Sequence, residues 1–125
     1  MVLIAERDRV VRDLESYALE QAGFRVEFAD DGQEALARAR LSRPALLITE
    51  ILLPRMDGLT LCRQLREDAS TRDVPVIVFS VLSAQARAEE AGANAYLRKP
   101  FIESLFLAIV DQALAAQGQA LMEIK

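Results

Sequence analysis

One carboxylate, Glu50, comes at the end of an apolar run and just before a loop that contains proline and glycine. The segment reads Ala45-Leu-Leu-Ile-Thr-Glu-Ile-Leu-Leu-Pro-Arg-Met-Asp-Gly58. An apolar run of this kind predicts a strand covered on both faces. In open α/β sheets, ligands and reactive groups lie at the carboxyl ends of the strands. The sequence therefore places Glu50 where a functional site is expected.

The elements around this segment alternate between short β-like runs and helical patterns. Strands are expected at Val2–Ala5, Arg25–Ala29, Ala45–Thr49, Val76–Phe79 and Ala95–Leu97. The first helix is expected after the cap residue Asp8, with an apolar face formed by Val10, Val11, Leu14, Tyr17, Ala18 and Gln21. The other helices are expected over Gln33–Arg40, Leu59–Arg66, Ser83–Ala91 and Glu103–Ala115. Five β-α alternations predict a parallel sheet with helices on both faces.

Length and composition restrict the class of protein. A chain of 125 residues with 52% hydrophobic residues is expected to fold as one domain. The net charge of -4 gives no basic surface for nucleic acid. The single cysteine, Cys62, indicates a reducing compartment and is expected in the core. We find no signal peptide and no apolar stretch that could span a membrane, so we expect a cytoplasmic protein without membrane contact.

Several motifs at consistent spacing carry a resemblance to a known family. They are Gly23-Phe-Arg-Val, Asp31-Gly-Gln-Glu-Ala-Leu36, Leu53-Pro-Arg-Met-Asp-Gly58, Val74-Pro-Val-Ile77, Gly92-Ala-Asn-Ala-Tyr96 and Lys99-Pro-Phe101. Together they resemble the receiver (response-regulator) domain of bacterial two-component systems. The resemblance implies a flavodoxin-like (βα)5 doubly wound sandwich, with a five-stranded parallel sheet of order 2-1-3-4-5. It covers residues 1–116 as a receiver-like domain, and we interpret residues 117–125 as a C-terminal tail or linker stub.

The resemblance also implies roles for individual residues. In the family, an acidic pair after the first strand holds Mg²⁺, and this pair falls on Glu6 and Arg7. The phosphoacceptor position, an aspartate in the family, falls on Glu50. The hydroxyl and the lysine that bind the phosphoryl group fall on Ser80 and Lys99, and the switch aromatic falls on Tyr96.

Two of these positions and the adjacent Val81 depart from the family pattern. Arg7 is a cation that cannot coordinate a metal. Glu50 is one methylene longer than aspartate, which displaces its carboxylate from an in-line trajectory. Val81 adds bulk beside the site. We therefore predict that the domain binds no Mg²⁺, takes no phosphoryl group and is not an enzyme. Instead, Arg7 is expected to lie against Glu50 or Glu6 with Lys99 nearby, which would hold Ser80 and Tyr96 in one arrangement.

These departures favour a pseudo-receiver: a phosphorylation-independent protein-interaction module in signal transduction. Its expected partners are signalling proteins, such as a histidine kinase-like, output or scaffold protein. The fourth helix is expected to be short and weakly amphipathic, which favours a monomer or weak dimer. Three alternatives stay open: a working phosphoacceptor receiver in a phosphorelay, a structural ion pair in an inactive pocket, and a flavodoxin-like binder of FMN or a nucleotide.

Overall fold

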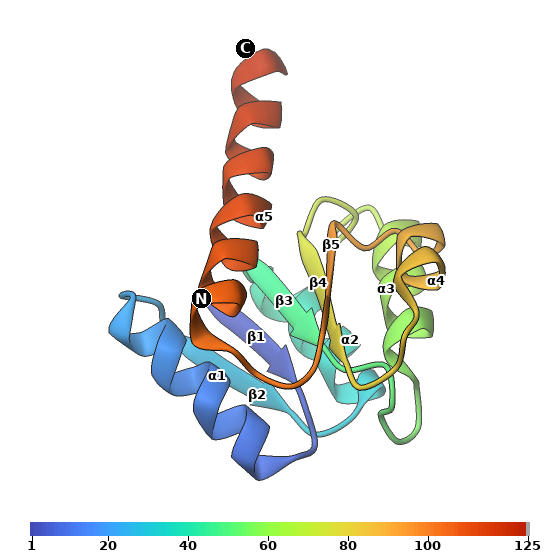
Figure 1. Cartoon of the computed structure of the whole chain (residues 1–125). Helices are drawn as coiled ribbons and strands as arrows, with labels where there is room; N and C mark the ends of the chain where they lie inside the picture. Colours follow the sequence, from blue (N-terminus) through green and yellow to red (C-terminus); the bar gives the residue numbers. More distant parts are fainter. Residues whose placement is uncertain (125) are drawn as a thin grey trace.

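The computed structural model describes the backbone of residues 1–124 and the side chains of residues 1–116. Five parallel strands form one sheet of order β2-β1-β3-β4-β5, as the sequence predicted (Figure 1). The strands are β1 (Val2–Ala5), β2 (Val26–Ala29), β3 (Leu46–Thr49), β4 (Val76–Ser80) and β5 (Ala95–Arg98). The helices are α1 (Arg9–Gln21), α2 (Gly32–Ser42), α3 (Gly58–Glu67), α4 (Gln85–Glu90) and α5 (Glu103–Ile124).

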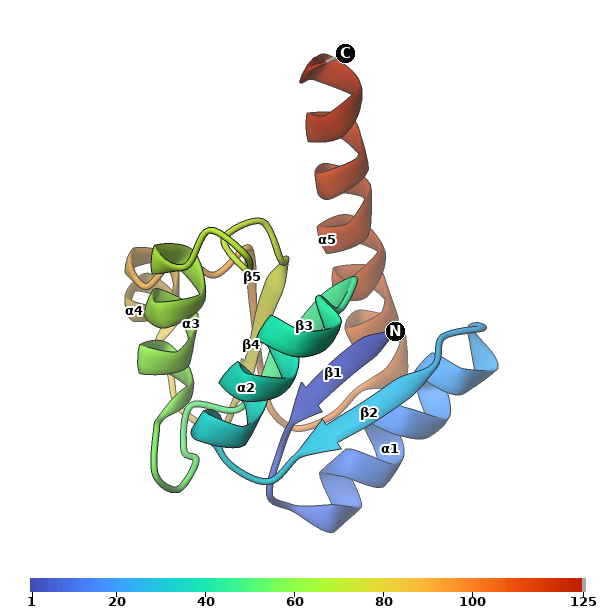
Figure 2. The same ribbon diagram turned by 180° about the vertical axis from the view of Figure 1, so that it is seen from behind.

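The helices cover the sheet in two layers. α1 and α5 pack on one face, where Leu19 and Phe106 join inward residues of the strands in one apolar cluster. α2, α3 and α4 cover the opposite face, where Leu36, Leu61 and Ala88 belong to a second cluster (Figure 2). Strands β1, β3 and β4 are buried along their whole length, whereas β2 at the edge is partly exposed. This difference confirms the contrast between uniformly apolar and alternating runs in the sequence.

The buried face of α1 differs from the predicted one. Val10, Leu14 and Tyr17 are exposed, with relative exposures of 69%, 44% and 65%. The helix instead buries a face that includes Glu15 and Leu19. The predicted apolar face was therefore wrong at Val10, Leu14 and Tyr17, whereas Ala18 is buried as predicted.

Arg12 explains this orientation of α1. Its guanidinium donates to the carbonyl oxygens of Glu6 and Ala29 and pairs with Asp30 at 2.8 Å. It also lies 4.8 Å from the centre of the Phe28 ring. These contacts with β2 and with the ends of β1 and β2 fix the rotation of the helix about its axis. The residues that share the Arg12 side, rather than the most apolar ones, consequently face the sheet.

The remaining helices lie where the sequence predicted them, with two notable lengths. α4 has only 6 residues, which confirms that the fourth helix is short. α5 has 22 residues and continues to Ile124, beyond the predicted end at Ala115. The helical backbone thus includes residues 117–124, whereas their side chains lie outside the description, so the interpretation of 117–125 as a linker stub stays a prediction. No helix in residues 1–124 is long and apolar enough to cross a membrane.

Candidate functional site

The ends of β1, β3, β4 and β5 meet at the carboxyl edge of the sheet. The backbone N–H of Glu50 donates to the carbonyl of Ala5 at 3.0 Å, which holds the residue after β3 beside the end of β1. The N–H of Lys99 donates to the carbonyl of Ser80 at 2.8 Å, which joins the ends of β5 and β4. Residues far apart in the sequence are thereby brought to one place.

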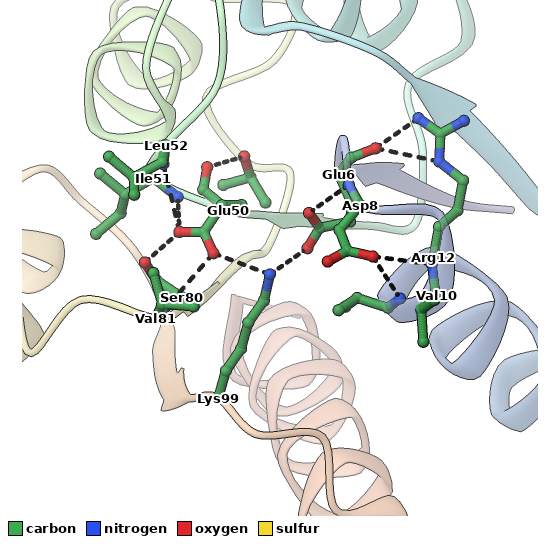
Figure 3. Close-up of polar contacts among 12 residues, drawn as sticks. Glu6, Asp8, Val10, Arg12, Glu50, Ile51, Leu52, Ser80, Val81 and Lys99 are labelled. Atoms are coloured by element: carbon green, nitrogen blue, oxygen red, sulfur yellow. Dashed lines mark hydrogen bonds and ion pairs between the residues drawn. The ribbon is translucent and has the colours of Figure 1, made fainter.

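The Glu50 carboxylate is buried, with 4% of the residue exposed, and both its oxygens accept hydrogen bonds (Figure 3). Oε1 accepts from the Ser80 hydroxyl and from the backbone N–H of Ile51 at 2.7 Å and of Leu52 at 3.3 Å. Oε2 accepts from the backbone N–H of Val81 at 3.2 Å and pairs with Lys99 Nζ at 3.0 Å.

Lys99 joins two carboxylates. Its Nζ lies 2.6 Å from Glu6 Oε1 and 3.0 Å from Glu50 Oε2, and its side chain is only 10% exposed. Burial alone would lower the pKa of Lys99, but the bonds to Glu6 and Glu50 outweigh it, so the pKa is raised above the usual 10.5. Burial alone would raise the pKa of Glu50, but the bonds from Ser80 and Lys99 and the Lys99 charge lower it below the usual 4.5. Both groups are therefore charged at neutral pH.

Glu6 is held from a second side as well. Its Oε2 accepts from the backbone N–H of Asp8 at 3.1 Å, and its backbone carbonyl accepts from Arg12. Asp8 in turn caps α1 by accepting from the N–H of Val10 at 2.9 Å. The start of α1 thus fixes the position of the Glu6 carboxylate, which is 3% exposed as a residue.

Arg7 does not join the cluster. It is exposed, and among the ion pairs of residues 1–116 it has none with Glu50 or Glu6. The prediction that Arg7 lies against one of these carboxylates was wrong. Lys99 supplies the cation between them, so Arg7 would have no partner there. Burying an unpaired guanidinium is costly, which favours its exposure.

Ser80 and Tyr96 are linked through the loop after β4. The backbone N–H of Leu82 donates to Ser80 Oγ at 3.1 Å, and the Tyr96 hydroxyl donates to the Leu82 carbonyl. The same hydroxyl accepts from the N–H of Ala84 at 3.3 Å. Tyr96 is half-buried. The loop thus joins the hydroxyl that contacts Glu50 to the aromatic ring on β5.

The loop after Glu50 is shaped by a close backbone approach at Gly58. A Cβ atom at this position would lie 2.1 Å from the Glu50 carbonyl oxygen, so only glycine fits. The neighbouring Asp57 accepts from the N–H groups of Leu59 and Thr60 and caps α3. Asp57 is therefore a turn and capping residue.

The side chains at this edge do not fit the Mg²⁺ that the family implies. Mg²⁺ requires several oxygen ligands in near-octahedral geometry. Here both oxygens of Glu6 and of Glu50 already accept from nitrogen or hydroxyl donors, and Lys99 places a cation between them. Residues 1–116 contain no group of three or more His, Cys, Asp or Glu side chains arranged to hold a metal. The absence of Mg²⁺ binding stays a prediction.

Sequence reasoning missed two side chains that shape the packing of α1 beside the site. Arg12 was not distinguished from the other arginines among the thirteen in the chain. Its position one helical turn after the cap residue Asp8 was the one feature of the sequence that could have indicated it. Glu15 stands one turn before Ala18 and Leu19 on the buried face of α1. It breaks the apolar pattern there, which is why the predicted face was drawn without it.

Comparison with known proteins decides the family. A family model described as the response regulator receiver domain matches residues 2–111. The chain belongs to the response regulator receiver family. The receiver domain is 38% identical over 116 residues to the DNA-binding dual master transcriptional regulator RpaA of Synechocystis, covering 90% of this chain and 48% of the relative. It is also 38% identical to the response regulator MprA of Mycobacterium leprae, covering 90% of this chain and 50% of that protein. The chain thus spans about half the length of these curated relatives.

Solved structures agree with this assignment. A putative response regulator from Chloroflexus aurantiacus superposes with a TM-score of 0.87 at 36% identity, covering 91% of this receiver domain and 96% of that chain. The chemotaxis response regulator CheY4 of Vibrio cholerae gives 0.84 at 28% identity, covering 90% and 97%. The comparisons support a signalling domain of two-component systems. They give no support to the pseudo-receiver variant, since these relatives are named simply as regulators.

Proposed function

We propose that this receiver domain works as a phosphorylation-independent interaction module, in which Glu50 occupies the groups that would otherwise bind a phosphoryl group. The single observation that supports this proposal is the bonding of the Glu50 carboxylate. It accepts from Ser80 and pairs with Lys99, the two side chains to which the family assigns phosphoryl binding. The additional methylene of glutamate extends its carboxylate toward these donors.

Phosphoryl transfer to Glu50 would require this arrangement to open. An attacking carboxylate oxygen needs a free lone pair directed at phosphorus, whereas both oxygens of Glu50 already accept hydrogen bonds. Catalysis of this transfer depends on positioning and on cations that clamp the phosphoryl oxygens. Lys99 is engaged by two carboxylates, and Arg7 lies exposed to solvent.

The partners of such a module are signalling proteins: a histidine kinase-like protein, an output domain or a scaffold. We expect no contact with nucleic acid by this domain, because its net charge is -4. α4 is a surface element of only six residues, so a symmetric dimer through α4, β5 and α5 would have little helical surface on that side. We therefore propose a monomer or weak dimer.

A working phosphoacceptor receiver is the second candidate, and the relatives favour it. Proteins named as response regulators match nine-tenths of this chain. Ser80 and Lys99, the phosphoryl-binding types, are both present at the site. In this alternative Glu50 would have to leave Lys99 and accept the phosphoryl group on one oxygen.

Intact mass measurement separates the two candidates. The domain is incubated with Mg²⁺ and acetyl phosphate, and the proposal predicts no gain of a phosphoryl group. The matched control is the double variant Glu50→Asp with Arg7→Asp, which restores the residue types of the family at both positions and is expected to gain one phosphoryl group. A stoichiometric gain in the unmodified domain that disappears in Glu50→Gln would establish the phosphoacceptor instead.

A further inference from the structure

Glu15 is a buried carboxyl group that takes no part in the ion pairs of the site. It lies on the face of α1 that packs against the sheet, and the residue is 1% exposed. Its Oε1 atom is buried without a hydrogen-bond partner. The next residues on the same helix face, Ala18 and Leu19, belong to the apolar cluster between the sheet and α5. A carboxylate in such surroundings would lose its hydration without replacement.

The charges near Glu15 do not compensate for this loss. Burial raises the pKa of Glu15 well above the usual 4.5, and the neighbouring carboxylates of Glu6 and Glu50 raise it further. Lys99 and Arg12 are the cations that oppose this effect. Lys99, however, is already bonded to Glu6 and Glu50, and Arg12 to backbone carbonyls. Neither cation is available as a close partner for a second negative charge.

We propose that Glu15 is a proton-sensing device built into α1: it holds a proton while α1 is packed on the sheet, and loss of that proton loosens the helix. Protonated Glu15 is neutral and tolerates the apolar layer. Ionised Glu15 repels Glu6 and Glu50 and competes with them for Lys99. The device thus couples the packing of α1 to the cluster at the carboxyl edge, whether or not Glu50 accepts phosphate.

The sign of the pH effect follows from the direction of the shift. A carboxyl group whose pKa is raised by folding binds more protons in the folded state, so it favours folding at low pH. This contribution to stability is fully present below the pKa of the unfolded state, near 4.5, and is lost as the pH rises through the pKa of the folded state. The chain has no histidine, the side chain that ordinarily titrates near neutral pH. A pH dependence in that range is therefore attributable to Glu15 by a single substitution.

Two measurements on the full chain test the device. The first follows the side-chain carbon of Glu15 by NMR from about pH 4 to 9, and we expect it to titrate well above the value of about 4.3 of an exposed glutamate. The second measures urea unfolding across the same range. One proton bound on folding changes the unfolding equilibrium constant about tenfold per pH unit. We expect a dependence approaching this limit in the unmodified domain and its loss in Glu15→Gln, which cannot ionise.

The matched control is Glu20→Gln, which removes an exposed carboxyl group from the same helix and should keep the pH dependence of the unmodified domain. The proposal is overturned if Glu15 titrates with the exposed glutamates. It is equally overturned if Glu15→Gln keeps the full pH dependence of unfolding. Should Glu15→Gln fail to fold, the NMR titration of the unmodified domain decides alone.

Discussion

Removing the Lys99 ammonium is the sharpest perturbation of the site. Lys99 Nζ lies 2.6 Å from Glu6 and 3.0 Å from Glu50, and both carboxylate side chains are 4% exposed. Lys99→Met keeps most of the side-chain length, but it leaves two buried carboxylates without their shared cation. The variant therefore isolates the electrostatic role of the ammonium group.

The expected magnitude follows from burial. An exposed ion pair contributes about 0–1 kcal/mol, whereas removing one partner of a buried pair costs about 3–5 kcal/mol. Protonation of Glu6 or Glu50 relieves part of this cost, so we expect the lower end, about 3 kcal/mol, at neutral pH. The urea dependence of unfolding for small domains is about 1–3 kcal/mol per molar, so the midpoint should fall by at least about 1 M.

Urea unfolding of Lys99→Met beside Arg98→Met measures this cost. Arg98 is the exposed neighbour on β5, and its substitution removes the same charge without opening the cluster. The free energy of unfolding should fall by about 3 kcal/mol in the first variant and by less than about 0.5 kcal/mol in the second. The cost at Lys99 should shrink at acidic pH, where the carboxylates take up protons. Equal effects of the two variants would refute the reasoning.

Three further variants test other contacts of the site. The pKa of Glu50 is lowered in the folded domain, so ionised Glu50 stabilises the fold above about pH 4.5, and this stabilisation is lost as the pH falls through the pKa of the folded state. As the pH is lowered from about 6 to 3, the urea midpoint of unfolding should therefore fall less steeply in Glu50→Gln than in the unmodified domain. An identical pH dependence of the two midpoints would contradict this. Gly58→Ala should lower the free energy of unfolding by at least about 1–3 kcal/mol, because its Cβ would meet the Glu50 carbonyl; an unchanged thermal midpoint would exclude that clash. Tyr96→Phe should cost about 0.5–1.5 kcal/mol and speed amide exchange at Ala84, whereas unaltered exchange would show that the hydroxyl does not hold the loop.

Sequence reasoning predicted the sheet well because each strand has a distinct pattern. The runs after Met1, Ala45 and Pro75 are almost wholly apolar and lie buried in β1, β3 and β4. The run around Val26 alternates and lies at the edge as β2. Glu50, Ser80 and Lys99 follow such runs, so the parallel topology brought them together as expected.

The wrong predictions concern contacts that depend on the rotation of a helix about its axis or on partners far apart in the sequence. Spacing alone could not show that Lys99, 93 residues from Glu6, would be the shared cation and leave Arg7 in solvent. Nor could apolarity show the rotation of α1, which depends on Arg12 reaching the carbonyls of Glu6 and Ala29. A buried glutamate on the sheet-facing side of α1 contradicts the expectation that the buried face of a helix is apolar. Only the three-dimensional packing reveals it.

We propose that the Glu50–Lys99 cluster already holds the domain in one arrangement. NMR relaxation dispersion on the amides around Ser80 and Tyr96, recorded with and without Mg²⁺ plus acetyl phosphate, tests it most directly. We expect these additives to leave the spectra and the exchange contributions unchanged, since Ser80 and Lys99 are engaged by Glu50. Substantial exchange in the free domain that the additives quench would mean that a phosphate-driven switch survives, and would contradict the account.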